Sequence, residues 1–278
     1  MSDHVFSAAR LRGYRAIEAA GGGEAVRLQI LDTAIGAQLW LPLSLVEVAF
    51  RNCADRNLAG AHERGQNWLL ESDLADRDLL AGDVKGLEAF VRIRDDGSAD
   101  DPVAEAALRA SQHLNRDRIS RDDLIAHLML GFWVVRVPEG LRGSGLDVFS
   151  LAAAELEGPL AEPAELRDVL VNQVAQLRNR VAHHEPVLFR SKHIFTKTGD
   201  PKLPIDLIAS LTGAIEKFVR NYEEVFTAAA SFAPMAADHL EEAKDAVGVL
   251  LTPFAEHLSG RLEELRHETR VRRAARRA

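Results

Sequence analysis

Apolar residues recur at three- and four-residue steps along most of this chain, which is the pattern of helices with one buried face. The spacing predicts an N-terminal helix over residues 6–20, ended by three glycines at 21–23. A long helix is predicted over residues 24–61, with Pro42 bending or restarting it. Residues 39–50 are apolar nearly all round this helix, so we expect that part to be buried.

Further helices are predicted over residues 74–93 and 102–118 and, with Ser120 as an N-cap, over residues 120–135. The strongest pattern lies over residues 164–184, where an apolar residue returns every three or four positions. Pro186 ends this helix, because the residue before a proline avoids the α conformation.

A narrow apolar seam then spans residues 208–225, with steps typical of coiled coils. It is formed by Ile208, Leu211, Ile215, Phe218, Tyr222 and Val225. The seam can pack inside a bundle or against a second copy of the chain. The pattern as a whole predicts an all-α fold, with a helical core over residues 1–231. Residues 232–278 are expected to form a C-terminal helical appendage with an arginine-rich end.

Composition narrows the class of protein. Aromatic residues make up only 6% of the 278 residues, which favours helix over sheet. The one cysteine, Cys53, excludes an internal disulfide and fits a reducing compartment. We expect no signal peptide, because the N-terminal residues 1–4 show no basic region followed by an apolar run. We expect no membrane span, because the longest apolar stretch, residues 39–50, is short and interrupted by polar residues. A cytoplasmic protein is therefore predicted, and its net charge of −8 requires any RNA-binding patch to be local.

The richest chemistry lies near the end of the helix predicted over residues 164–184. Asn179 and His183 are four residues apart and share a face. Arg178 lies about 140° around the helix from His183, and its long side chain could reach toward the histidine near the helix end. Arginine binds phosphate through a bidentate fork, and histidine transfers protons near neutral pH. Such a set can cleave an RNA backbone without a metal. The alternative interpretation is a solvated helix end, whose cations match the helix dipole.

Residues 178–185, Arg-Asn-Arg-Val-Ala-His-His-Glu, resemble the signature of the Abi-like (abortive infection) branch of the HEPN superfamily. In that signature an arginine, usually followed by asparagine, precedes a histidine late in a helical bundle. Residues 40–52 are similar to the family's early helix, and residues 124–133, with their Gly-Phe-Trp element, to its middle helix. Residues 10–23 also resemble the family's opening, whereas the chain from Pro234 onward has no counterpart in it.

The resemblance implies an HEPN-type helical bundle that acts as a metal-independent endoribonuclease and as a homodimer, without a cofactor. Phage defence or a toxin–antitoxin pair would be its context, with a protein or RNA antitoxin as a further partner. By position, Arg178 would hold the scissile phosphate and Asn179 would orient the phosphate or the histidine. His183 would act as general base or acid on the ribose 2′-hydroxyl and the leaving group.

Two hypotheses of other classes remain open. In the first, the chain is a non-catalytic HEPN protein that binds RNA or a partner. In the second, it is a structural helical module that dimerises through the seam at residues 208–225. We expect no metal at His183, His184 and Glu185, because adjacent residues on a helix point in different directions.

Other residues are candidates for supporting roles. Glu47 and Arg51 have the spacing of an ordinary ion pair within a helix, or they support the site from behind together with His184. Arg180 and Lys192 lie close to the motif and are candidate RNA contacts. A basic stripe that could track an RNA backbone is formed, if the C-terminus is helical, by Arg266, Arg270, Arg273 and Arg277. The alternative for this stripe is a solvated terminus.

Overall fold

The computed structural model describes residues 7–63, 65, 68–69, 79–80, 92–93, 99–100, 106, 109–110, 112–114 and 118–275. The chain divides into two compact units. Unit 1 comprises Met1–Leu43, Gln176–Thr227 and Ala236–Ala278, and unit 2 comprises Ser44–Ala175 and Ala228–Met235.

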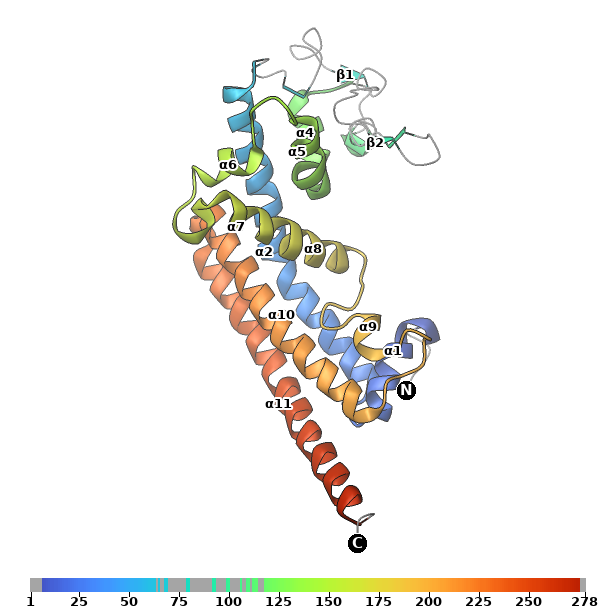
Figure 1. Cartoon of the computed structure of the whole chain (residues 1–278). Helices are drawn as coiled ribbons and strands as arrows, with labels where there is room; N and C mark the ends of the chain where they lie inside the picture. The colour runs from blue at the N-terminus through green and yellow to red at the C-terminus, as the bar shows by residue number, and fades with distance from the viewer. Residues whose placement is uncertain are drawn as a thin grey trace. The chain divides into compact units, whose positions relative to one another are not determined.

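Helices dominate the described part of the chain (Figure 1), which confirms a predominantly helical fold. In chain order the elements are α1 (Ala8–Ala19), α2 (Ala25–Ala61), β1 (Leu79–Leu80), β2 (Arg92–Ile93), β3 (Ala99–Asp100), β4 (Arg118–Ile119), α4 (Arg121–His127), η3 (Phe132–Arg136), α5 (Val137–Gly140), α6 (Val148–Ala153), η4 (Gly158–Ala161), α7 (Pro163–Asp168), η5 (Val169–Val174), α8 (Ala175–Ala182), α9 (Ser191–Ile194), α10 (Pro204–Phe232), η6 (Pro234–Ala236) and α11 (Ala237–Ala275). The short strands form two antiparallel pairs, β1 with β4 and β2 with β3.

The two helices predicted over residues 74–93 and 102–118 lie mostly outside the described residues. Within the first range, β1 and β2 are strands, so the prediction of helix is wrong at those four residues. Gly82 and Gly86 in the sequence make a helix costly there, by roughly 1 kcal/mol each relative to alanine. Within the second range, the described residues up to Leu114 are helical, but Arg118 belongs to β4, so the prediction is wrong there. The helix predicted over residues 120–135 is interrupted at residues 128–129, after α4 ends.

Unit 1 begins with α1, which follows the predicted pattern. Ser7 caps its first turn by accepting a hydrogen bond from the backbone N–H of Arg10, at 3.3 Å. The chain then leaves the helix through Gly21, which has a φ of +79° that favours glycine. Helix α11 contacts this turn, because Arg261 Nε donates to the Ala20 carbonyl at 3.4 Å and His257 Nε2 lies 3.1 Å from the Gly21 carbonyl oxygen.

The apolar seam of α10 is covered within the chain. All six of its residues are buried, none exposing more than 7% of its surface. The seam therefore packs inside the bundle, and the hypothesis that it serves as a dimer face is wrong. Helix α11 also belongs to unit 1 and buries one face, at Leu240, Ala243, Val247, Leu251, Phe254, Leu258, Leu262 and Leu265. The observed division thus differs from the predicted core and appendage, because most of α11 is part of the core.

Helix α2 runs without interruption through Pro42, so the chain does not restart there. Its apolar second half buries only one face, and Trp40, Leu41 and Val48 expose 51%, 38% and 44% of their surface. The expectation that residues 39–50 are buried all round is therefore wrong. Among the described helices, α2 is the one long and apolar enough to cross a membrane by length and composition alone. The prediction of no membrane span rests on residues 39–50 alone, whereas the apolar helix runs from Ala25 to Ala61. Core helices of soluble proteins meet the same criterion of length and composition, so the criterion does not by itself place α2 in a membrane.

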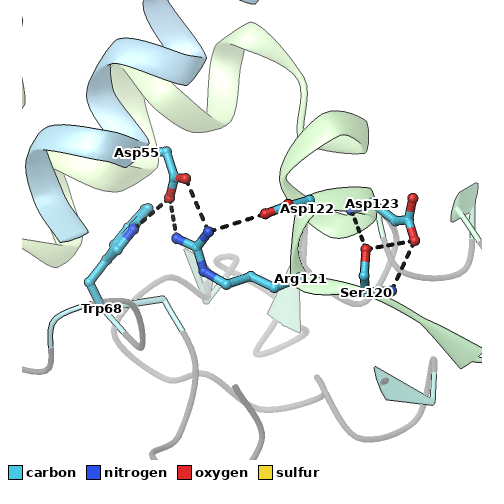
Figure 2. Close-up of polar contacts among 6 residues, drawn as sticks. All are labelled: Asp55, Trp68, Ser120, Arg121, Asp122 and Asp123. Atoms are coloured by element: carbon cyan, nitrogen blue, oxygen red, sulfur yellow. Dashed lines mark hydrogen bonds and ion pairs between the residues drawn. The ribbon is translucent and has the colours of Figure 1, made fainter. Parts of the chain in front are cut away.

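In unit 2, Asp55 ties α2 to the start of α4. Arg121 donates to both carboxylate oxygens of Asp55, with Nη1 at 3.1 Å from Oδ2, and Trp68 Nε1 donates to Oδ1 at 2.8 Å (Figure 2). Ser120 is the N-cap of α4, as predicted, and forms a capping box with Asp123 (Figure 2). The Arg121 and Asp55 side chains are only 11% and 17% exposed, so this ion pair is largely shielded from water.

Candidate functional site

The motif at residues 178–185 lies at the end of a continuous helical stretch formed by α7, η5 and α8. Five of the six residues of the predicted apolar stripe are buried along it, at Leu166, Val169, Leu170, Val174 and Leu177, and the sixth, Val181, is half-buried. Regular helix ends at Ala182, two residues before the predicted end. His183 and His184 therefore lie in the turn that leaves the helix, and both are exposed.

This turn is a helix C-cap closed by two backbone hydrogen bonds. Glu185 N–H donates to the Arg180 carbonyl at 2.8 Å, and His184 N–H donates to the Val181 carbonyl at 3.1 Å. The pattern is a Schellman motif, in which the residue after the cap adopts a left-handed conformation. That residue is His184, with a φ of 53°, although glycine is usual there.

Two charged side chains then fix the segment that follows. Arg180 donates to the carbonyls of Val187, at 3.2 Å, and Phe189, at 2.6 Å. Asp32 of α2 accepts the backbone N–H groups of Val187 at 3.0 Å and Leu188 at 2.9 Å. Residues 187–189 are buried, so their backbone groups need such partners. The direction in which the chain leaves the motif is thus set by one arginine and one aspartate.

Burial is the main influence on the pKa values of both groups. It raises the pKa of Asp32 to about 6, against the hydrogen bonds from Leu188 and Val187 and the charge of Arg180. It also lowers the pKa of Arg180, with a further contribution from the nearby charge of Arg190. Two guanidinium N–H groups of Arg180 already bind carbonyls of the chain. This geometry gives Arg180 a positioning role, and its predicted contact with RNA stays a prediction.

A basic cavity of about 750 Å³ opens beside the turn, between α1 and residues 183–199. His183, His184 and Glu185 line it from the helix end. Its positively charged lining comes from Arg10, Arg12, Arg190, Lys192 and Lys197, all of them exposed. In a chain with a net charge of −8, this is a local concentration of positive charge, as RNA binding would require.

The wall opposite the helix end is a short turn held against α1. Phe195 and Pro201 form an isolated β-bridge, which closes the turn that carries Lys197. Arg12 of α1 donates to the Gly199 carbonyl at 3.0 Å, and its guanidinium lies over the Phe195 ring, 4.8 Å from the centroid. These contacts fix the position of the turn and hold Lys197 at the cavity.

A second cavity of about 550 Å³ lies along α2, and we call it the α2 cavity. Helix α2 lines it with Gln29, Asp32, Thr33, Gly36, Ala37 and Trp40. Arg10, His184 and Glu185 line both cavities. His184, the residue with the left-handed backbone, therefore stands where the two cavities meet.

The structure brings together some of the predicted site residues and leaves others apart. His183 and Lys192 line the basic cavity, and His184 lines both cavities. Arg178 is half-buried and Asn179 is exposed, and neither lines one of these two cavities. Both residues precede the C-cap turn, on α8 itself.

Glu47 and Arg51 lie in unit 2 and contact the segment at the end of α4. The Leu130 N–H donates to Glu47 Oε1 at 3.1 Å, and Arg51 Nη1 donates to the Ala126 carbonyl at 2.7 Å. Burial lowers the pKa of Arg51, while the charge of Glu47 raises it. Both side chains thus hold backbone groups near the end of α4, and their support of the motif stays a prediction.

The predicted basic stripe begins where α11 stops being buried. Arg266, Arg270 and Arg273 are helical and exposed, beyond the last buried residue, Leu265. Arg277 lies outside the described residues. The stripe requires a helical C-terminus, and the structure shows a helix at its first three arginines.

Sequence reasoning missed Asp32 and the arginines of α1. A signal existed for Asp32, which is a single carboxylate between Leu31 and Ile35 on an apolar helix, and such a group needs partners when buried. Arg10 and Arg12 carried no such signal. Their importance comes from a fold that places them opposite residues 183–199.

Comparisons with protein-family models, with curated proteins and with solved structures found no match to this chain. Within the described residues, no group of three or more histidine, cysteine, aspartate or glutamate side chains is placed to hold a metal ion.

Proposed function

We propose that this chain is a metal-independent endoribonuclease of the Abi-like HEPN type, acting in the cytoplasm in phage defence or as the toxin of a toxin–antitoxin pair. The observation that carries the proposal is the position of His183. This exposed histidine lines a cavity whose other walls carry five arginine and lysine side chains. A proton-transfer group beside a site suited to phosphates is what RNA cleavage through the 2′-hydroxyl needs.

In the proposed reaction, His183 removes the proton of a ribose 2′-hydroxyl. The 2′-oxygen attacks the adjacent phosphorus, the bond to the 5′-oxygen breaks, and that oxygen takes up a proton. The products are a 2′,3′-cyclic phosphate and a 5′-hydroxyl. Arg178 holds the phosphate oxygens and Asn179 orients the phosphate or the histidine. One histidine does not readily serve both sides of the phosphorus, so the proposal includes a homodimer in which a second copy supplies the acid.

The test is to incubate total RNA with the purified protein and with the His183→Ala variant, in the presence of EDTA. We expect discrete fragments ending in cyclic phosphate from the wild type and none from the variant. Circular dichroism and size-exclusion chromatography should give the same helical content and the same oligomer for both, because His183 is exposed. Full cleavage by the variant would remove His183 from the mechanism. Loss of cleavage in EDTA, with recovery on adding a divalent ion, would exclude the metal-free route.

A second candidate function is binding of RNA or of a partner without cleavage. The observation that favours it is that Arg178 and Asn179 line neither cavity, so the described chain does not gather the three predicted catalytic side chains around one cavity. Intact RNA in both incubations, together with retained RNA binding, would favour this function.

A further inference from the structure

The positive charges of the basic cavity have no negative partners within the described part of the chain. Across those residues, none of its five arginine and lysine side chains forms an ion pair with a carboxylate. The contacts they do make are with neutral groups. Arg12 binds the Gly199 carbonyl and the Phe195 ring, and Arg190 Nη2 donates to Gln176 Oε1. Neutral acceptors orient a guanidinium without neutralising it. The described lining holds one carboxylate, Glu185, against five arginine and lysine side chains, so the cavity keeps a net positive charge.

A neighbouring histidine is affected by the same potential. His193 of α9 is adjacent in sequence to Lys192, and its Nδ1 accepts the backbone N–H of Arg190 at 3.2 Å. Burial lowers its pKa to about 4, with further lowering by the charges of Lys192, Lys202, Arg190 and Arg180. Burial disfavours a charge of either sign at His193, and the four neighbouring cations add to the cost of a positive one.

The shape of the cavity fits a ligand larger than a single ion. Its volume of about 750 Å³ lies within the range of pockets that hold small organic ligands, roughly 300–1,000 Å³. Its charges are spread over α1, the start of α9 and the turn after α9. A ligand with several negative groups meets charges on three sides, whereas one ion would meet only some of them.

We propose that the basic cavity binds phosphate groups of a nucleotide ligand, with Arg10, Lys192 and Lys197 as its phosphate contacts. Arg12 is a positioning residue, because its guanidinium holds the turn that carries Lys197. The inference deepens the proposed function by locating substrate phosphates beside His183, and it rests on that function only for the statement that the ligand is RNA. A phosphorylated RNA strand and a free nucleotide share this chemistry, and the experiment distinguishes them.

The experiment measures binding in full-length protein carrying His183→Ala, so that RNA stays intact. The probes are a fluorescein-labelled single-stranded RNA of mixed sequence, followed by anisotropy, and ATP, followed by calorimetry. One variant carries Lys192→Gln with Lys197→Gln. Its matched control carries Lys217→Gln with Arg220→Gln, which removes the same charge from exposed positions on α10 that line neither cavity. Circular dichroism should show equal helical content in both.

We expect the lysine variant to bind RNA roughly tenfold more weakly than the control at low salt. Its slope of log K against log salt should fall by roughly 1.4, because each single-strand phosphate that a lysine no longer neutralises lowers the slope by about 0.7. Weaker RNA binding identifies the ligand as the RNA strand. Weaker ATP binding with unchanged RNA binding identifies a free nucleotide. Unchanged binding of both probes, relative to the control, overturns the proposal.

These outcomes are separate from those of the cleavage test. If the wild type cuts RNA and the lysine variant binds both probes like the control, the endoribonuclease stands and the cavity proposal fails. If no RNA is cut and the lysine variant still binds more weakly than the control, the cavity proposal stands and catalysis fails.

Discussion

At the residue scale, His184 occupies a backbone position where histidine is costly. Among the described residues, it is the one non-glycine residue with a positive φ. A left-handed conformation costs a residue with a Cβ roughly 1–2 kcal/mol, and glycine avoids this cost. The imidazole lines both cavities, so the position at which the backbone is strained is also one that borders the candidate ligand site.

Replacing His184 by glycine is therefore expected to stabilise the fold and weaken RNA binding. We expect the free energy of unfolding to rise by roughly 1 kcal/mol, because glycine adopts this cap conformation without strain. Urea denaturation followed by circular dichroism measures this change, and anisotropy measures binding. His184→Ala is the control, since it removes the ring but keeps the strain, so binding should weaken without a gain in stability. A less stable glycine variant would mean that ring contacts outweigh the backbone strain.

The site was only partly predictable from individual residues. The helix end near His183 and His184 follows from local periodicity and from Pro186, so the sequence could place these histidines in the last turn of a helix. It could not show that regular helix ends before them and leaves both in an exposed turn. The roles of Arg180 and Arg10 could not be found in this way. Arg180 binds carbonyls that a turn brings back to it, and Arg10 reaches the cavity through the packing of α1.

At the scale of elements, local pattern located the helices but not how much of each is covered. The seam of α10 is buried, whereas part of the equally apolar residues 39–50 is exposed. Both stretches are apolar enough for burial, and whether a residue in them is buried or exposed depends on which neighbouring elements pack against it. A pattern along one helix carries no information about those neighbours.

The contact between α2 and α4 yields an element-scale prediction. Asp55 accepts hydrogen bonds from Arg121 and Trp68, and removing it takes away a shielded carboxylate that binds the shielded Arg121 guanidinium through two N–H groups. We expect Asp55→Ala to lower the free energy of unfolding by about 3 kcal/mol, measured by urea denaturation. Asp122→Ala is the matched control, because Asp122 lies 3.6 Å from Arg121 but is 94% exposed. If Asp122→Ala lowers the free energy of unfolding as much as Asp55→Ala does, the loss comes from removing any negative charge near Arg121 and not from breaking the shielded ion pair.

At the scale of the whole molecule, unit 1 is assembled from three separate segments of the chain. The sequence predicts an appendage for its C-terminal segment, which has no counterpart in the family that the rest of the chain resembles. The structure instead places Arg261 and His257 of α11 against the turn after α1, more than two hundred residues earlier in the sequence. Contacts at such separation leave no local pattern, so the helix could be predicted but its place could not.

Two truncations separate the structural part of α11 from its exposed end. Removing residues 236–278 deletes all eight buried positions of α11, so we expect unit 1 to lose cooperative thermal unfolding. Removing residues 266–278 deletes only residues beyond Leu265, among them the six arginines at 266, 270, 272, 273, 276 and 277. This shorter truncation should leave the melting temperature nearly unchanged.

Anisotropy with labelled RNA then tests the basic stripe in the folded, shorter truncation. The salt slope should fall by about 0.7 for each single-strand phosphate that a deleted arginine neutralises, and so by roughly 2 if the arginines at 266, 270 and 273 are the ones that contact the strand. An unchanged slope would assign these arginines to a solvated helix end. If the chain still unfolds cooperatively after removal of residues 236–278, the prediction that α11 is an appendage is correct, because unit 1 then folds without it. The longer truncation thus decides whether α11 as far as Leu265 is core or appendage, and the shorter one decides whether its exposed end is an RNA contact or a solvated helix end.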